Sequence, residues 1–319
     1  MKKVFVFTVS AVLFVLGMSS CVHKELCYNH AHTVNVNVVF DWRDAPDASP
    51  ESMSLYMFPS NGQEAIRYDF TERNGGVIRV PIGKYDAICL NSDTKNTILR
   101  NTLSANTFEI STRPASLVAG LGALLGKVNN APMAEGTEDE TVASEPEMLW
   151  TDHSRQEIEL NLTEESYTIV FYPQQSVCLY DVKILNADNL KYVQGVSGAI
   201  SGLAGGELPY SDKVTSELVT IPFEATANLE DSSITGNLRT FGYHHESSPK
   251  HQLTVYAILS DGSKWYYTYD VTEQIHNAPD PRIVHIVLDG LPLPKPIVNG
   301  GGFQPSVGDW VSIDVGINM

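Results

Sequence analysis

The stretch that decides the fold runs from residue 253 to residue 269 and reads LTVYAILSDGSKWYYTY. Two apolar and aromatic runs, Leu253 to Leu259 and Lys264 to Tyr269, flank the segment Ser260-Asp261-Gly262-Ser263. An Asp-Gly pair between two such runs is the strongest short-range signal for a β-hairpin, because the turn needs residues that tolerate positive φ. We therefore expect two antiparallel strands joined by a tight turn.

Short strands of this kind are predicted along the whole chain. In the first of them, Val or Phe occupies every even position from 34 to 40, which is typical of a strand with one buried face. Further strand candidates lie at 53–58, 65–70, 77–80, 85–91, 108–111, 156–162, 167–171, 178–185, 214–227, 234–241, 283–288 and 310–315. Many short strands separated by Gly and Pro turns favour β-sandwiches, so the predicted fold class is all-β.

The length of the chain fits two β-sandwiches in series. Of 319 residues, some 20 belong to an N-terminal signal that is described below, and the rest makes one large or two medium domains. We place an N-terminal β-sandwich at 32–165 and a C-terminal β-sandwich at 166–319. No unit of about 20 to 50 residues repeats, which argues against solenoids and propellers.

Two segments do not read as strands. Residues 116–126 are apolar but contain three glycines, so they fit either a short helix or a glycine-rich loop packed on the core. Residues 134–147 hold five glutamates and one aspartate with few apolar residues, which predicts a solvated loop.

The first 20 residues have the three parts of a secretory signal peptide. Two lysines precede an apolar run from Val4 to Leu16, and Gly17-Met18-Ser19-Ser20 leads to Cys21. The run is too short to span a bilayer core of roughly 30 Å as a stable helix. A cysteine directly after Ser19-Ser20 resembles a bacterial lipobox, which implies cleavage before Cys21 and a diacylated Cys21 thiol. Residues 21–31 then form a lipid tether outside the cytoplasm.

Composition excludes some functions. A formal net charge of −17 argues against nucleic acid as a partner, because little here would neutralise phosphates. Four cysteines are present. With lipid on Cys21, the remaining Cys27, Cys89 and Cys178 allow one disulfide at most, and Cys89 and Cys178 lie in strand-like apolar runs where buried thiols are usual.

A search for reactive sites finds little. His30-Ala31-His32 and His244-His245 are the histidine clusters, and neither has a third ligand at a spacing typical of a metalloenzyme. Ser197-Gly198 lacks the strand-to-helix context of a nucleophile elbow. A pair of catalytic carboxylates distant in sequence stays open as an alternative. We expect no enzyme activity, no cofactor and no metal.

The aromatic residues of the opening hairpin are candidates for a ligand face. On a strand, Trp265, Tyr267 and Tyr269 share one face, and Tyr266 takes the other. Such a face could stack on sugar rings, but it more often forms core, and this hairpin needs one buried face. Core is therefore the favoured interpretation, with glycan binding through Trp265, Tyr267 and Tyr269 as the alternative.

Several segments taken in order resemble a family of Bacteroidales lipoproteins of uncharacterised function, similar to the anchor and minor subunits of the fimbrillin superfamily. The segments that carry the resemblance are Cys21–Trp42, Gly76–Asp86, Val196–Gly198, Gly236–Gly242, Leu259–Gly262 and Asp270–Thr272. The resemblance implies two transthyretin-like, Greek-key β-sandwich domains and an outer-membrane lipoprotein. By analogy it also implies a role in anchoring or limiting a fimbrial polymer.

The sequence departs from a fimbrial shaft subunit in one respect. The family implies that shaft subunits have a protease-cut N-terminal strand that neighbours exchange. Here Arg43, Arg67 and Arg73 lie in or beside the first predicted strands, so cutting at them would remove core strands. An anchor that keeps its N-terminus and its lipid fits better. Residues 22–26 are only weakly acidic, which leaves the periplasmic or surface face of the outer membrane open.

The leading hypothesis is a non-enzymatic outer-membrane lipoprotein, a fimbrillin-like anchor or accessory subunit. It would bind another β-rich subunit through a sheet edge or groove, where main-chain hydrogen bonds give affinity. The alternatives are a glycan-binding surface lipoprotein that uses the face around Trp265 and an uncharacterised hydrolase with dispersed acids.

Overall fold

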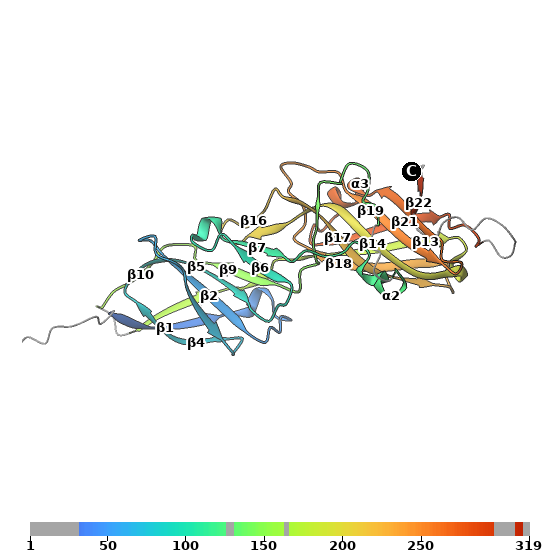
Figure 1. Cartoon of the computed structure of the whole chain (residues 1–319). Helices are drawn as coiled ribbons and strands as arrows, with labels where there is room; N and C mark the ends of the chain where they lie inside the picture. The colour runs from blue at the N-terminus through green and yellow to red at the C-terminus, as the bar shows by residue number, and fades with distance from the viewer. Residues whose placement is uncertain (1–31, 126–130, 163–165, 297–309, 315–319) are drawn as a thin grey trace, which may run out of the picture.

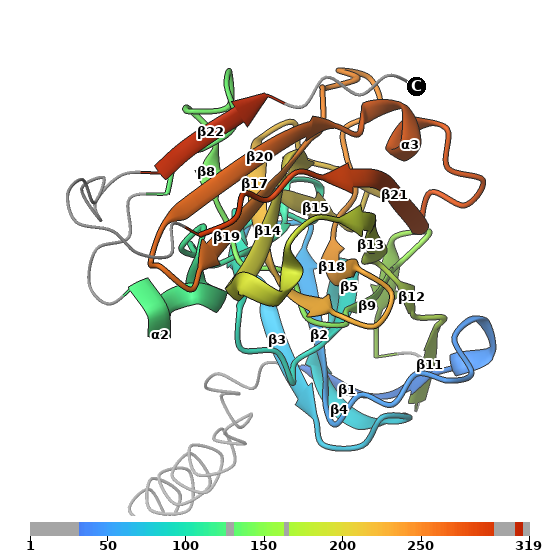
Figure 2. The same ribbon diagram turned by 90° about the vertical axis from the view of Figure 1, so that its right-hand side faces the viewer.

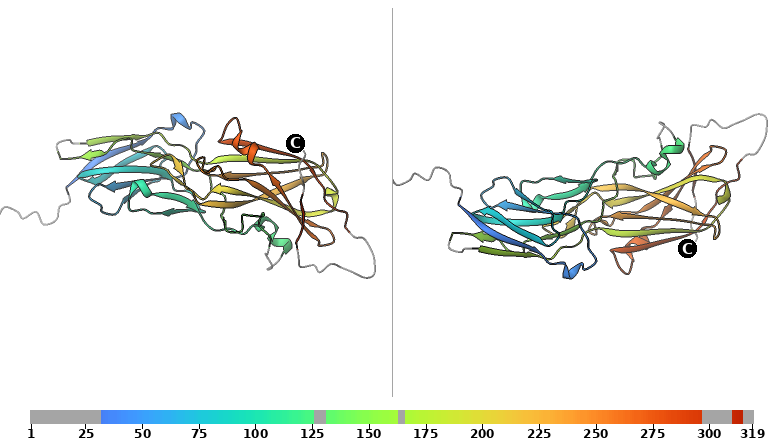
Figure 3. Two further views of the ribbon diagram at one scale, coloured as in Figure 1. Left: turned by 90° about the horizontal axis from the view of Figure 1, so that it is seen from above. Right: turned by 90° about the horizontal axis from the view of Figure 1, so that it is seen from below.

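The computed structural model describes residues 32–125, 131–162, 166–296 and 310–314. Strands dominate the structure and confirm the all-β prediction. They form two groups of sheets, one toward each end of an elongated molecule (Figure 1, Figure 3). The predicted signal peptide (1–20), Cys21 and the tether (21–31) lie outside the described residues.

The group of sheets next to the N-terminus, called the N half below, is a sandwich of two sheets. One sheet has the order β11-β1-β4, and the other has the order β12-β9-β5-β2-β3 with β10 paired to β5. Apolar side chains from both sheets meet in one core cluster. The strands are β1 (Thr33–Phe40), β2 (Met53–Pro59), β3 (Ile66–Phe70), β4 (Gly75–Pro81), β5 (Gly83–Asn91), β9 (Trp150–His153), β10 (Ile158–Leu160), β11 (Ser166–Phe171) and β12 (Gln174–Gln175).

The other group, called the C half, is one path of strands in the order β21-β13-β18-β17-β14-β19-β20-β22, with β8 paired to β17. Strand β17 belongs to both layers, because its first part pairs with β14 and its last part pairs with β18. Figure 2 looks onto this end of the molecule. The strands are β8 (Thr141–Val142), β13 (Cys178–Ala187), β14 (Val193–Ala204), β17 (Leu218–Asn228), β18 (Ser233–Thr240), β19 (Gln252–Leu259), β20 (Lys264–Asp270), β21 (Ile283–Leu291) and β22 (Trp310–Asp314).

A third, smaller sheet joins the two halves. Its order is β16-β15-β7-β6, with β7 and β15 paired although they are far apart in sequence. A separate apolar cluster lies here and combines Tyr56 and Ile88 of the N half with Ala204 and Phe241 of the C half. The strands are β6 (Thr97–Arg100), β7 (Glu109–Thr112), β15 (Gly206–Leu208) and β16 (Lys213–Val214).

Helices are few and short in the described residues. They are the 3-10 turns η1 (Trp42–Asp44), η2 (Ala105–Thr107), η3 (Ala119–Leu121) and η4 (Leu190–Tyr192) and the α-helices α2 (Gly122–Leu125) and α3 (Thr272–His276). The ambiguous segment 116–126 therefore contains helical turns, as one of its two interpretations predicted.

The predicted hairpin of residues 253–269 forms as β19 and β20, paired from Gln252↔Asp270 to Ile258↔Lys264. The strand pairing places one strand on the other side of the predicted domain boundary at residue 165. Strand β11, which was assigned to the C-terminal sandwich, pairs in parallel with β1 of the N half. After β8 has paired in the C half and β9–β12 have returned the chain to the N half, the chain re-enters the C half at Cys178, the first residue of β13. Periodicity identified β11 as a strand but carries no information about which sheet it joins.

The acidic segment 134–147 is not a loose solvated loop. The carboxylate of Glu140 accepts hydrogen bonds from the main-chain N of Gly202 at 3.1 Å and from the Thr220 hydroxyl at 2.8 Å. Glu145 forms an ion pair with Arg239 at 2.6 Å. These contacts fasten the segment to the C half, where Figure 3 shows the neighbouring turns around α2 lying along the outside of the sandwich.

Candidate functional site

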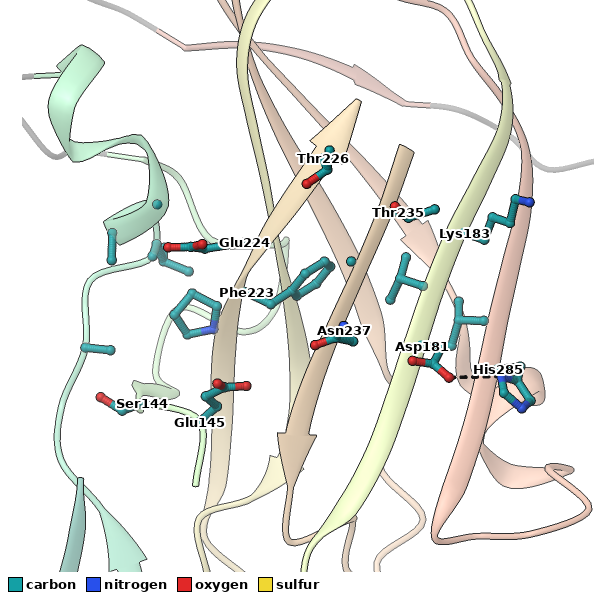
Figure 4. Close-up of a pocket in the computed structure, with 18 of the residues that line it drawn as sticks. Ser144, Glu145, Asp181, Lys183, Phe223, Glu224, Thr226, Thr235, Asn237 and His285 are labelled. Atoms are coloured by element: carbon teal, nitrogen blue, oxygen red, sulfur yellow. Dashed lines mark ion pairs between the residues drawn. The ribbon is translucent and has the colours of Figure 1, made fainter. Parts of the chain in front are cut away.

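A groove of about 1030 Å³ lies on the outer face of the C half (Figure 4). Its floor is the exposed side of β21, β13, β18 and the last part of β17, and its wall is the segment around residues 115–120. Alternation along β13 explains the polar floor, since Tyr180, Val182 and Ile184 are buried while Asp181 and Lys183 between them are exposed.

The floor presents hydrogen-bonding side chains from four strands. Asp181 and His285, on paired strands, lie 3.3 Å apart. Asn237 stands beside them on β18, and Glu224 lies across the groove, next to the wall (Figure 4). The Asp181 and His285 side chains are 55% and 68% exposed, so solvent screens their interaction and the floor is an open surface.

Phe223 supports this floor from inside the sandwich. Its ring fills space that Gly236 and Gly198 leave empty: a Cβ built on Gly236 would lie 2.6 Å from Phe223 Cε2, and one on Gly198 would lie 2.3 Å from Phe223 Cζ. The lack of a side chain at these two glycines permits the close approach of another group. The group that approaches is an aromatic ring from β17.

The groove does not have the features of a hydrolase site. Its carboxylates belong to Glu145, Asp181 and Glu224, and none of the three residues is buried. Glycoside hydrolysis needs one carboxylic acid kept neutral near pH 7, which burial usually achieves. The arrangement can bind polar groups, but it holds no carboxyl set up for proton transfer.

The predicted aromatic ligand face is part of the core. Tyr267 is 0% exposed and Tyr269 is 2% exposed, and their hydroxyls donate to the carbonyls of Pro292 and Gly290 at 3.0 and 3.1 Å. Trp265 packs against the same core cluster and is partly buried. The rings of Tyr267 and Tyr269 are not available to a glycan, because the hairpin needs a buried face and uses this one. Cys21, the predicted lipid site, lies outside the described residues.

Within the described residues, no three His, Cys, Asp or Glu side chains come close enough to hold a metal ion. Cys89 and Cys178 are free thiols, and burial raises the pKa of both. Of the predicted histidine pairs, His245 packs its ring on Tyr243 with 4.2 Å between centroids. His32 is exposed, and His30 lies outside the described residues.

A buried histidine cluster escaped the sequence analysis. The rings of His251 and His276 both pack on Tyr243, and the centroids of the two imidazole rings are 5.1 Å apart. His251 is fully buried, and its Nδ1 donates to the Ser201 carbonyl at 3.1 Å. Burial lowers the pKa of His251 to about 4, so its imidazole is neutral. The three residues are distant in sequence, so their spacing gives no signal.

Glu207 at the joining sheet was also missed. Its Oε1 accepts a hydrogen bond from the Thr151 hydroxyl at 3.3 Å, and its buried Oε2 has no partner among the described residues. Burial raises the pKa of this carboxyl to about 7. Arg155 and Arg282 line the same small pocket between the halves.

Two sheet edges of the C half differ in how they are covered. At one end, the amide of Gln274 on α3 pairs with β21: Val287 N donates to Gln274 Oε1 at 2.8 Å, and Gln274 Nε2 donates to the Val287 carbonyl at 3.0 Å. At the other end, β22 pairs in parallel with β20 and ends the path of strands. The side chain of Gln274 thus covers the β21 edge at Val287, and β22 forms the edge at the other end of the path of strands.

Comparison with known proteins places the chain. A family model described as a domain of unknown function, DUF5119, matches residues 20–224. The chain belongs to the DUF5119 family. A protein of Bacteroides ovatus named as a fimbrium anchoring subunit, Fim4B, is 25% identical over 205 residues, which are 63% of this chain and 54% of that protein. The chain thus spans about half the length of this curated relative.

Solved structures agree on the fold of this DUF5119 member. A Bacteroides ovatus protein described as an adhesin has a TM-score of 0.63 at 22% identity, covering 83% of this chain and 95% of that chain. The fimbrial anchor protein Mfa2 from Porphyromonas gingivalis has a TM-score of 0.50 at 12% identity, covering 80% and 91%. The predicted resemblance to fimbrial anchor subunits is therefore confirmed.

The curated relative is thus named as a fimbrium anchoring subunit, and the two solved structures are described as an adhesin and a fimbrial anchor protein. Among the described residues, no helix has the length and apolar character needed to cross a membrane.

Proposed function

We propose that the protein is an anchor or accessory subunit of a fimbrium. It is held at the outer membrane by lipid on Cys21 and binds another β-rich subunit through its C half. The named relative Fim4B motivates the fimbrial part, and the signal peptide with its lipobox-like end motivates the lipid.

The observation that carries the proposal is the place of β1. This strand lies between β11 and β4 and pairs with both, and its Val36 and Val38 are 0% and 1% exposed. Removal of β1 would open the N-half core. A subunit that keeps this strand keeps a continuous chain from the core to the proposed lipid, as an anchor requires.

The arginines near β1 fit the same role. Arg73 places its guanidinium 5.2 Å from the Trp42 ring centroid, and Trp42 Nε1 donates to the Arg73 carbonyl at 2.8 Å. Arg67 lies within β3 and pairs with Asp69 at 2.8 Å. A protease needs an extended, accessible loop, and these two sites are held in a packed turn and a strand.

The edge strand β22 is the surface we assign to the partner subunit. It pairs with β20 from Lys264↔Trp310 to Thr268↔Asp314 and ends the sheet. An edge strand presents main-chain N–H and C=O groups to which another strand can add. Addition at this end of the C half would place the partner away from the N-terminal end of β1 (Figure 1).

Lipid attachment is tested by replacing Cys21 with Ser, with Cys27→Ser as the matched control. We expect the Cys21→Ser protein in the soluble fraction and the control in the outer membrane. A Cys21→Ser protein that stays membrane-bound would exclude lipid anchoring through this residue. The fimbrial role is tested by deleting the gene, and fimbriae of unchanged length and attachment would exclude it.

The groove on the C half supports glycan binding as a second function. Its floor combines a carboxylate, an amide and an imidazole, groups that bind sugar hydroxyls through hydrogen bonds. The test is a glycan array probed with the Cys21→Ser protein, which carries no lipid. The same array is then probed with Asn237→Ala and with Glu230→Ala, an exposed control. Absence of binding, or binding that Asn237→Ala leaves unchanged, would exclude the groove as a glycan site.

A further inference from the structure

The pairing of β1 with β11 has a consequence for how the N half responds to tension. The two strands are parallel and in register over six residue pairs, from Asn35↔Ser166 to Phe40↔Phe171. The chain before residue 32 joins β1 at its N-terminal end. The last link of the chain to the C half leaves β11 at its C-terminal end, passes through β12 (Gln174–Gln175), which pairs with β9 of the N half, and reaches β13 at Cys178. In a parallel pair these two ends are opposite ends of the ladder.

We propose that β1 and β11 form a mechanical clamp that is loaded in shear when tension runs from the N-terminal tether to the C half. A force of this geometry acts along the strands. It therefore loads the hydrogen bonds of the ladder together, whereas a force at one end of a pair would break them one after another. The proposal takes its source of tension from the proposed anchor function, but the clamp itself is a property of the strand pairing.

Hydrogen bonds hold β1 on both sides and beyond both of its ends. On its other side it pairs with β4 from Thr33↔Pro81 to Val39↔Gly75. Past its C-terminal end, the N–H of Asp41 donates to the Phe171 carbonyl at 2.8 Å. Before its N-terminal end, the N–H of Ile82 donates to the His32 carbonyl at 2.8 Å. Sliding of β1 toward the tether must break both ladders.

The core resists the same motion. Val34, Val36, Val38 and Phe40 point inward, and none is more than 6% exposed. A slip of one residue would turn these side chains outward, because alternate residues face opposite sides of a strand. A slip of two residues would draw the first of them out of the core. No small displacement of β1 keeps both its pairing and its burial.

The test is single-molecule force spectroscopy on the full mature chain in two pulling geometries. One handle is fixed in both, at the exposed Glu230, in the turn that joins β17 to β18. The other handle is placed either before residue 32 or at the exposed Asp47, in the loop after β1. The first geometry shears β1 against β11. The second geometry pulls on the C-terminal end of β1, which lies beside the C-terminal end of β11. It therefore peels β1 from β11, so that their hydrogen bonds break one after another.

We expect the force that unfolds the N half to be several-fold higher with the N-terminal handle than with the Asp47 handle at the same loading rate, since forced unfolding follows the unfolding rate. Equal forces, or a lower force with the N-terminal handle, would overturn the clamp. Equal stability of both tagged proteins in denaturant shows that neither handle disturbs the fold. Because no membrane or fimbria is present, this result is independent of the gene-deletion test of the anchor function.

Discussion

The carboxylate of Glu207 on β15 and the hydroxyl of Thr151 on β9 are joined by a hydrogen bond of 3.3 Å, although they are 56 positions apart in the chain, one in the joining sheet and the other in the N half. The buried Oε2 of Glu207 has no partner among the described residues. The junction therefore contains a carboxyl whose ionised form is costly.

Glu207 should make the stability of the protein fall as pH rises. Its folded pKa, raised by burial, is about 7 against an ordinary 4.5, so between these values the folded state keeps a proton that the unfolded state has lost. Stability is then greatest below pH 4.5 and decreases up to pH 7. Glu207→Gln should remove this slope, which amounts to on the order of 3 kcal/mol, as measured by urea unfolding from pH 4.5 to 8.

The control for Glu207 is Glu230→Gln, an exposed glutamate in a turn. It should leave the pH dependence of unfolding unchanged. If Glu207→Gln and Glu230→Gln give the same pH profile as the unmodified protein, the raised pKa of Glu207 has no effect on folding.

His251 should have the opposite effect over nearly the same pH range. Its folded pKa is about 4, lowered by burial from an ordinary 6.5. Between these values the unfolded state binds a proton that the folded state does not, so stability is complete above pH 6.5 and is lost as pH falls toward 4. His251→Gln should abolish this loss. The measurement is the slope of the free energy of unfolding against pH, and the free energy at any single pH is not compared.

The two slopes oppose each other, so the unmodified protein should vary less with pH than either single variant. Glu207→Gln should unmask the His251 slope, and His251→Gln should unmask the Glu207 slope. The double variant should be flatter than both. Single variants whose slopes have the same sign would contradict this account.

The sequence was informative about elements that local pattern determines. The alternation at residues 34–40 and the Asp261-Gly262 turn identified β1 and the β19–β20 hairpin, because period and turn chemistry act within a few residues. The sheet that β11 joins and the attachment of segment 134–147 depend on residues far away in the chain. Glu140 looks like a solvated charge until Gly202 and Thr220 are placed beside it.

The candidate site was less predictable than the fold. Its floor comes from four strands, and only their pairing brings Asp181, Asn237 and His285 together. The aromatic run at 265–269 was conspicuous in sequence, but its buried face is core. Burial creates the unusual pKa values of Glu207 and His251, and burial of a polar side chain leaves no periodic signal in one sequence.

Gly236 and Phe223 should be strongly coupled. A Cβ on Gly236 would lie 2.6 Å from Phe223 Cε2 and 2.9 Å from the Glu224 carbonyl, so Gly236→Ala should cost roughly 1–3 kcal/mol through overpacking. Phe223→Ala should cost about 3–5 kcal/mol through cavity formation. The double variant should lose less than the sum, since the smaller side chain makes room for the new methyl group.

The measurement for this pair is a double-mutant cycle from denaturant unfolding, with Gly122→Ala as the control. A Cβ on Gly122 meets no atom within 4 Å, so this change should be nearly neutral. Additive losses for Gly236→Ala and Phe223→Ala would show that the ring does not occupy the space above the glycine.

Gln274 should act as a cap on the β21 edge. Its amide makes two hydrogen bonds with the main chain of Val287, as a neighbouring strand would, and Val287 itself is 49% exposed. Gln274→Ala should lower the free energy of unfolding by only about 0.5–1.5 kcal/mol, because water replaces these hydrogen bonds. It should nevertheless leave an open strand edge next to an exposed apolar side chain. This combination favours strand pairing between molecules. We expect concentration-dependent association of Gln274→Ala in sedimentation experiments, whereas Glu273→Ala on the same helix should stay as the unmodified protein. Gln274→Glu keeps the acceptor for Val287 N but faces the Val287 carbonyl with a second oxygen, so it should destabilise the protein more than Gln274→Ala. A Gln274→Ala protein that associates no more than the Glu273→Ala control would show that the edge is protected by other means.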